Sequence, residues 1–310
     1  MRTATSIEEL IGNTPLLRLG DLEPQGGAEV WAKLEYLNPG LSVKDRLGAA
    51  LIRAAEDSGE LPPGGTVVEA TAGNTGIALA LVGRRLGYRV VLLVPEKFSL
   101  EKQHLMRALG AELILTPTEE GMDGAQQRAR RIAADTPGAV YVDQFSNPAN
   151  PQAHESTTGP EILEQTNGRL DALVVGCGSG GTFTGTVRFL KGQIPGLHAV
   201  AVEPVGSVLG GGEPGAHEVE GIGMDAIHPV IDTSLIDEVI AVPDPEAFEM
   251  VRSLAGACGV LAGSSGGANV WAAIEVAKRL TPDARVVTMI PDSSERYLSK
   301  GLFQMFLEER

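Results

Sequence analysis

Short apolar segments alternate with longer segments of helical periodicity along most of the chain. Strands are predicted where β-branched residues cluster, at 66–70, 89–94, 112–116, 139–142, 171–175, 198–203 and 284–290. Helices are predicted between them, at 46–58, 74–86, 99–109, 121–134, 182–190, 245–258 and 267–280. Apolar residues recur there at intervals of three and four, as at Leu47, Ala50, Leu51 and Ala54.

This alternation predicts an α/β fold with mostly parallel sheets and helices on both faces. The segment 90–94 is apolar without interruption, which is typical of a strand that is buried on both sides. Turn residues gather at 61–65 and again at 147–151, and the second group is the predicted crossing between two domains. The glycine-rich stretch from 210 to 223 predicts a mobile, irregular loop of the kind that covers a site.

Composition narrows the classes of partner. The chain has 310 residues and a net charge of −15, which argues against nucleic acid and an anionic membrane surface; the charge itself serves solubility. Residues 1–10 lack the apolar core of a signal peptide, and the longest apolar runs are too short to span a bilayer. Two cysteines cannot form a disulfide framework, so we expect a cytoplasmic protein.

A glycine-rich run, 176–181, lies between the predicted strand at 171–175 and the helix that starts at Thr182. Glycines let the backbone curl so that several N–H groups face one point, and a helix N-terminus adds partial positive charge. Ser179 and Thr182 add hydroxyl groups. The run therefore predicts an anion site.

The same run allows a second interpretation. Gly176, Gly178 and Gly181 fit the pattern Gly-x-Gly-x-x-Gly, and Glu203 ends the next predicted strand, where a dinucleotide fold carries its ribose-binding acid. A Rossmann-type, NAD-linked oxidoreductase is therefore an alternative. The position of the run in mid-chain and its hydroxyl-rich helix start favour a single phosphate group instead.

Lys44 is the candidate catalytic residue. It follows the turn formed by Asn38, Pro39 and Gly40 and lies at the start of a predicted helix, with Ser42 as a possible cap. A lysine held at such a junction can point inward, and burial lowers the pKa of its amine. An amine of this kind together with a phosphate cradle is what an enzyme needs to hold pyridoxal phosphate.

Two further polar loops precede predicted helices. The loop 71–76 can bind a carboxylate or a ring hydroxyl, although helix capping explains Asn74 and Thr75 equally well. The loop 263–268 offers a serine to a pyridine nitrogen, and capping is again the simpler explanation. The five histidines are scattered without metal-ligand spacing, so no metal site is predicted. We expect Cys177 to be a packing residue.

Taken together and in order, these motifs resemble those of the cysteine synthase / cystathionine β-synthase family, whose members use pyridoxal phosphate and have the tryptophan-synthase-β fold. The resemblance extends from 11–16 to 291–299 and includes 144–151 and 157–161. It implies two three-layer αβα domains, known as fold type II. The smaller domain would comprise residues 36–147 and the larger one 1–35 plus 148–310, with the cofactor in the cleft between them.

The resemblance also implies roles for individual residues. Lys44 is similar to the lysine that bonds covalently to the cofactor, Asn74 to the residue at its ring hydroxyl, and Ser265 to the one at its ring nitrogen. The phosphate would be held by Gly178, Ser179, Gly180, Gly181 and Thr182. The amino-acid substrate would be held by Thr71, Ala72, Gly73, Thr75, Gln144 and Gly221.

The implied reaction is β-replacement on O-acetylserine, in which sulfide gives cysteine and acetate. Ala72 departs from the family, which usually has serine there, and so removes one hydroxyl from the expected carboxylate site. With 210–215 and 291–294, Ala72 resembles a subgroup that also accepts homocysteine, so an O-acetylserine-dependent cystathionine β-synthase is an alternative. A catalytically silent binding or regulatory protein is a third hypothesis. The family implies a homodimer.

Overall fold

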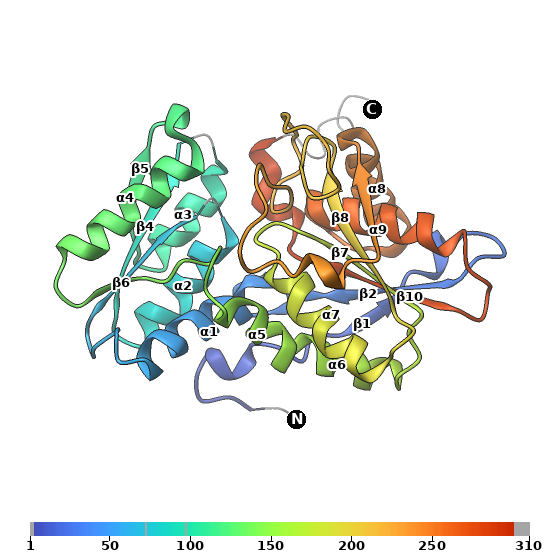
Figure 1. Ribbon diagram of the computed structural model, residues 1–310, viewed down its shortest axis with the longest axis horizontal. Coiled ribbons are helices and arrows are strands. Elements are labelled where there is room, and N and C mark those ends of the chain that lie inside the picture. The colour runs from blue at the N-terminus through green and yellow to red at the C-terminus, as the bar shows by residue number, and fades with distance from the viewer. Residues whose placement is uncertain (1–2, 72, 97, 301–310) are drawn as a thin grey trace.

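The computed structural model describes residues 3–71, 73–96 and 98–300. Ala72, one of the predicted substrate-binding residues, lies outside the described residues. Two β-sheets lie side by side, and helices cover both faces of each (Figure 1). The predicted fold class, α/β with mostly parallel sheets, is confirmed.

The smaller sheet has four strands in the order β5-β4-β3-β6, and all its pairings are parallel. Its strands are β3 (Thr66–Ala70), β4 (Arg89–Pro95), β5 (Glu112–Thr116) and β6 (Ala139–Tyr141). The helices α1 (Lys44–Asp57), α2 (Asn74–Arg85) and α3 (Leu100–Ala108) pack on one face, and α4 (Gly121–Asp135) packs on the other. Successive side chains of a strand point to opposite faces, so Val67 and Val90 join the first core whereas Val68 and Val91 join the second.

The larger sheet has six strands in the order β1-β2-β10-β7-β8-β9, and only the edge pairing of β1 with β2 is antiparallel among the described strands. Its strands are β1 (Leu16–Arg18), β2 (Glu29–Leu34), β7 (Ala172–Gly176), β8 (His198–Pro204), β9 (Glu238–Val242) and β10 (Arg285–Ile290). The helices α8 (Asp244–Cys258) and α9 (Ser264–Ala277) cover one face, and α6 (Thr158–Thr166) and α7 (Gly181–Gln193) cover the other.

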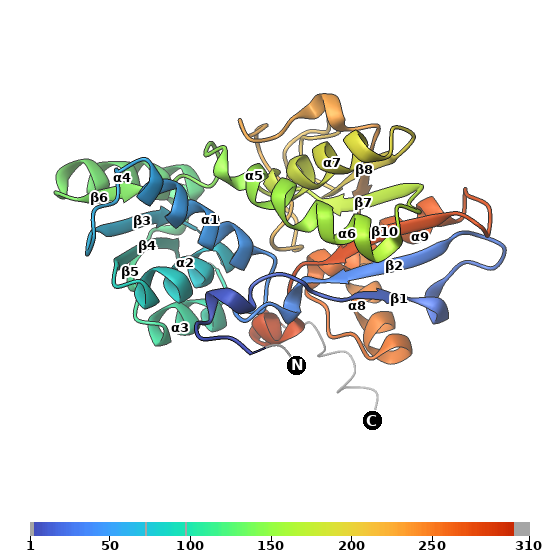
Figure 2. The ribbon, with the colours of Figure 1, turned by 90° about the horizontal axis from the view of Figure 1, so that it is seen from below.

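Helix α5 (Ala149–Ser156) lies between the two sheets and packs against both α1 and α7 (Figure 2). The turn predicted at 147–151 is therefore wrong from Ala149 onward. Pro148 is the residue before the helix, and Pro151 falls in the first turn, where its missing N–H breaks no helical hydrogen bond. Proline content alone made this helix resemble a turn.

The remaining elements are short 3₁₀ helices. They are η1 (Glu8–Leu10), η2 (Gly20–Leu22), η3 (Glu35–Leu37), η4 (Thr118–Glu120), η5 (Thr233–Leu235) and η6 (Ser294–Lys300). Between β8 and η5 the chain forms only turns, bends and irregular backbone, as predicted for the glycine-rich stretch. No helix in the described part of the chain is long and apolar enough to cross a bilayer.

Candidate active site

Five of the predicted residues line one narrow cavity. They are Lys44, Gly178, Gly180, Thr182 and Gly221. Val175 and Gly176, at the carboxyl end of β7, and Pro291, just after β10, also line it. Ligands of open α/β sheets bind at the carboxyl ends of parallel strands, and this cavity has that position.

Lys44 is the first residue of α1, and its N–H donates to Ser42 Oγ at 3.3 Å. The segment before it is fixed to the end of β10, because Val43 N–H donates to the carbonyl of Pro291 at 2.8 Å. Burial lowers the pKa of the Lys44 amine to about 8, although the Asp292 carboxylate nearby opposes this shift. A substantial neutral fraction near physiological pH is what a nucleophilic or proton-accepting amine requires.

A buried network of charges holds the start of α1 in place. The Arg46 guanidinium binds the Glu35 carboxylate at 2.8 Å and the Glu161 carboxylate at 2.7 Å, and Lys33 binds Glu161 at 2.7 Å. Burial opposes ionisation of Glu35, but Arg46 outweighs it and holds the pKa of this carboxyl at about 2. These bonds connect α1 to β2 and α6, and so they fix the position from which Lys44 extends.

The turn from β7 to α7 is the segment predicted to hold a phosphate. The first N–H groups of α7 have no partner within the helix and carry the positive end of its dipole. A Cβ on Gly178 would lie 2.4 Å from the carbonyl oxygen of Gly221, so only glycine allows this approach of cradle and loop. Ser179 and Thr182 are buried, and each hydroxyl contacts a side chain of α5. Backbone donors, hydroxyls and the nearby amine fit an organic phosphate.

The loop after β3 contacts both sheets. Thr71 Oγ1 accepts from Gly73 N–H at 3.3 Å, and Thr75 donates to Gln144 Oε1 at 2.7 Å. The Asn74 amide donates to Asp292 Oδ2 at 2.6 Å, and its oxygen accepts from the Arg296 guanidinium. The predicted residues Thr71, Gly73, Thr75 and Gln144 are therefore neighbours, and Asn74 connects them to the segment after β10.

Ser265 lies in the first turn of α9 and is buried. A Cβ built on Gly221 would lie 3.8 Å from its hydroxyl, which places Ser265 beside the cavity wall. The neighbouring Ser264 accepts from the Glu220 N–H at 3.0 Å. The predicted ring-nitrogen loop thus lies against the same segment, 220–222, that borders the cradle.

Sequence reasoning missed several polar residues at the site. Asp292 is buried, accepts from Tyr297 at 2.5 Å, and its Oδ1 has no partner among the described residues. Lys102 of α3 binds Glu220 at 2.9 Å and lies against Gly73. Asp292 follows β10 directly, so the rule that strand ends carry the site could have indicated it. No comparable signal exists for Lys102, because its partner is distant in the sequence.

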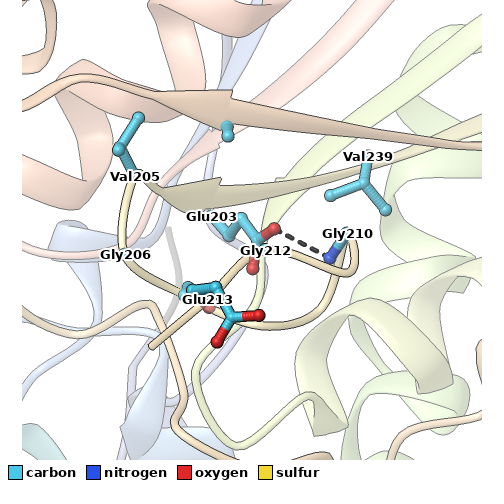
Figure 3. Close-up of a pocket in the computed structure, with 9 residues that line it drawn as sticks. Glu203, Val205, Gly206, Gly210, Gly212, Glu213 and Val239 are labelled. Carbon is cyan, nitrogen blue, oxygen red and sulfur yellow. Dashed lines mark hydrogen bonds between the residues drawn. The ribbon is translucent and has the colours of Figure 1, made fainter. Parts of the chain in front are cut away.

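Glu203 does not serve a dinucleotide. Its two carboxylate oxygens accept the N–H groups of Leu209 and Gly210, each at 2.8 Å. Figure 3 shows the bond to Gly210. These bonds fold the following loop around a cavity of about 310 Å³ that Glu203 and Gly210 line. An acid committed in this way is not free to bind a ribose. Cys177 is fully buried and packs in the core, and burial raises the pKa of its thiol, so it is no nucleophile at neutral pH.

Fold and site together define an α/β protein with a buried lysine beside a glycine-rich turn and a helix N-terminus. Residues 7–292 match the family model described as pyridoxal-phosphate dependent enzyme. The chain belongs to this family, and its cofactor is pyridoxal phosphate. The NAD-linked alternative finds no support.

Proteins similar to this chain include cysteine synthases and O-acetylserine dependent cystathionine beta-synthases. The chain is 50% identical over 304 residues to the O-acetylserine dependent cystathionine beta-synthase of Bacillus subtilis, covering 98% of this chain and 99% of that protein. It is 46% identical over 306 residues to the cysteine synthase of Helicobacter pylori, covering 98% and 100%. The crystal structure of O-acetylserine dependent cystathionine beta-synthase from Helicobacter pylori superposes with a TM-score of 0.93 at 45% identity, covering 98% and 100%.

Proposed function

We propose that the protein catalyses β-replacement on O-acetylserine and, with sulfide as acceptor, acts as a cysteine synthase. The observation that carries this proposal is the convergence of Lys44 and the glycine cradle on one cavity. The identity of 46% to a cysteine synthase over nearly the whole chain supports the choice of reaction.

In this proposal the cofactor phosphate is held by the cradle, Gly178 to Thr182, while Asn74 and Ser265 contact the ring. Bound pyridoxal phosphate supplies the electron sink that makes the α-proton of an amino acid acidic. The Lys44 amine, which would be released from the cofactor when the substrate amine takes its place, would remove this proton and later return it at the same carbon. Its pKa of about 8 suits both directions of transfer.

The substrate carboxylate is assigned to the loop after β3 and to Gln144. The contacts assigned on the loop side are Thr71, Ala72, Gly73 and Thr75, and the hydrogen bond from Thr75 to Gln144 joins this loop to the segment after β6. Gly221 lies where the substrate amine would approach the cavity. Backbone N–H groups and hydroxyls bind a carboxylate without adding a competing charge.

Lys44→Ala tests the catalytic assignment. We expect the variant to fold and to lose β-replacement activity, whereas Lys278→Ala, at an exposed lysine of the larger unit, keeps it. Borohydride reduction of the wild-type protein should attach the cofactor to the peptide that contains Lys44, as read by mass spectrometry. Label on another lysine, or turnover by Lys44→Ala, would refute the assignment.

A second candidate differs only in the acceptor. The identity of 50% to an O-acetylserine dependent cystathionine beta-synthase favours homocysteine. Steady-state rates with O-acetylserine and either sulfide or homocysteine, measured side by side, decide between the two. A higher kcat/KM with sulfide supports the first proposal and a higher kcat/KM with homocysteine the second. No consumption of O-acetylserine with either acceptor would favour the catalytically silent protein.

We further propose that residues 36–147 form one domain and residues 1–35 with 148–310 the other, in a cytoplasmic homodimer. All four strands of the smaller sheet fall within 66–141, which supports the division. Light scattering after size-exclusion chromatography tests the dimer. A mass of one chain, about 32.4 kDa, would contradict it.

A further inference from the structure

Helix α5 carries two buried polar side chains one turn apart, Asn150 and His154. Asn150 Nδ2 donates to the hydroxyl of Ser179 at 3.0 Å, and His154 Nε2 lies 3.2 Å from the hydroxyl of Thr182. Both hydroxyls belong to the phosphate cradle. Helix α5 packs directly on α7, behind the cradle (Figure 2).

We propose that Asn150 and His154 are positioning residues that make the Ser179 and Thr182 hydroxyls donate their protons to the cofactor phosphate. This inference rests on the proposed role of the cradle. It assigns to α5 a function in cofactor binding, although α5 itself lines no part of the cavity.

The orientation of the Asn150 amide follows from its second contact. Its Nδ2 also donates to the backbone carbonyl of Gln144 at 2.7 Å, and this oxygen can only accept. The donor end of the amide therefore faces Ser179. A hydroxyl oxygen that accepts from the amide keeps its own proton for another partner. Gly181 permits this contact, because a Cβ there would lie 1.9 Å from Asn150 Oδ1.

The imidazole of His154 carries a single N–H proton, on either Nδ1 or Nε2. Burial lowers the pKa of the imidazole to about 3, and the nearby Lys44 and Arg46 charges add to this effect, so the ring is neutral. Its Nδ1 lies 2.9 Å from the hydroxyl of Thr158. If Nε2 carries the proton, Thr158 donates to Nδ1, His154 donates to Thr182, and the Thr182 proton is free for an anion. The opposite tautomer would turn the Thr182 proton away from the cradle.

Anion binding favours the tautomer in which Nε2 of His154 carries the proton. A phosphate oxygen gains a stronger hydrogen bond from a hydroxyl than a neutral imidazole nitrogen does, because one partner is charged. Both α5 side chains then act in the same way. Each donates a hydrogen bond to a cradle hydroxyl, and that hydroxyl donates its own proton to the phosphate. The helix N-terminus of α7 supplies further donors to the same anion.

The experiment compares the affinity of the apoenzyme for pyridoxal phosphate and for pyridoxal, which lacks the phosphate. We expect His154→Phe and Asn150→Leu to weaken pyridoxal phosphate about tenfold or more, the usual effect of losing a hydrogen bond to a charged group. The affinity of these variants for pyridoxal should equal that of the wild type. His154→Gln, whose amide can donate in place of Nε2, should retain most of the affinity. Ser156→Ala, on the exposed side of α5, should change neither.

Equal weakening of both ligands in His154→Phe and Asn150→Leu would mean that α5 only supports the fold and would overturn the proposal. A wild-type protein that binds both ligands equally would instead refute the cradle assignment itself. If the variants do not fold, the tautomer of His154 in the wild-type protein tests the proposal instead. ¹⁵N NMR of histidine-labelled holoenzyme should show a proton on Nε2 of His154. A proton on Nδ1 contradicts the proposal.

Discussion

At the scale of single residues, Asp45 stands next to Lys44 in an unusual electrostatic position. It is fully buried, its Oδ2 accepts from Gly40 N–H at 2.5 Å, and its Oδ1 has no partner within the described part of the chain. Burial raises the pKa of this carboxyl to about 7, although the Gly40 N–H and the charge of Arg296 oppose the shift. The fold therefore prefers Asp45 protonated.

This preference predicts a pH-dependent stability. Because the folded-state pKa exceeds the unfolded value, the stability that Asp45 contributes is complete below about pH 4 and is lost as the pH rises through about 7. Asp45→Asn keeps an oxygen for Gly40 but cannot ionise. We expect the Tm of the variant minus that of the wild type to be larger at pH 8 than at pH 5, by roughly 2 °C or more.

Asp135→Asn, at an exposed carboxylate, is the control and should show the same difference at both pH values. A difference for Asp45→Asn that does not change between pH 5 and pH 8, measured by thermal unfolding, would contradict a raised pKa of Asp45 in the folded state.

The residues predicted from the sequence share one property: each lies in a loop that joins a strand to a helix or begins a helix. Lys44, the cradle and the loop around Asn74 could be found for this reason, since glycines, hydroxyls and turn residues mark such loops. Lys102 and Glu220 could not be found, because neither is unusual locally. Their partnership spans 118 positions and exists only after folding.

At the scale of elements, hydrogen bonds connect η6, which follows β10 of the larger sheet, to α3, which packs on the smaller sheet. Ser99 accepts from Lys102 N–H at the start of α3 and donates to the carbonyl of Arg296 at 2.8 Å. The Glu101 carboxylate accepts from the N–H and the hydroxyl of Ser299, at 2.7 and 2.8 Å. Burial opposes ionisation of Glu101, but these hydrogen bonds hold its pKa at about 2.

Glu101→Ala should therefore release η6 locally. The amide of Ser299 loses a charged acceptor, and we expect its hydrogen exchange to accelerate about tenfold or more. Exchange in the strands of both sheets should be unaffected, because the contact lies at their periphery. Glu119→Ala in η4, an exposed position, is the matched control. Unchanged exchange at Ser299, followed by mass spectrometry or NMR, would show that other contacts hold η6.

Periodicity predicted buried and exposed elements alike, since β3 is buried throughout whereas β5 is largely exposed. β3 and β5 have the predicted bounds, and α2 and α4 agree within one residue. β2 was missed because Glu29 and Lys33 interrupt its apolar pattern. Lys33 is fully buried there only because Glu161 of α6 neutralises it. α5 was missed because prolines are frequent in turns as well as in first helical turns.

At the scale of the whole molecule, the site depends on how the two sheets are placed relative to each other. Lys102 contacts three separate segments: Gly73 after β3, Glu220 in the loop after β8, and the ring of Tyr297 in η6, whose centroid lies 4.1 Å from its Nζ. In the same region, the Asn74 amide donates a hydrogen bond to Asp292, which follows β10 of the larger sheet. A lysine of α3, which packs on the smaller sheet, therefore binds the loop after β8 that borders the cavity, and its charge is compensated there.

Exchanging the two charges tests whether this ion pair holds the sheets together. The side chains of Lys102 and Glu220 are only 4% and 16% exposed, and breaking a buried pair costs about 3–5 kcal/mol. We therefore expect Lys102→Glu alone to lower Tm by roughly 5 °C or more. Adding Glu220→Lys restores opposite charges and should recover at least about half of the loss.

The same exchange at Arg131 and Asp135, a pair that is 85% and 70% exposed, should change Tm little, because exposed pairs contribute up to about 1 kcal/mol. If the double variant at 102 and 220 is as unstable as the two single losses added together, the attraction between these charges does not hold the units in place. Packing of Tyr297 and Gly73 against the lysine stem would then be the stabilising contact, and Lys102→Met should retain the wild-type Tm.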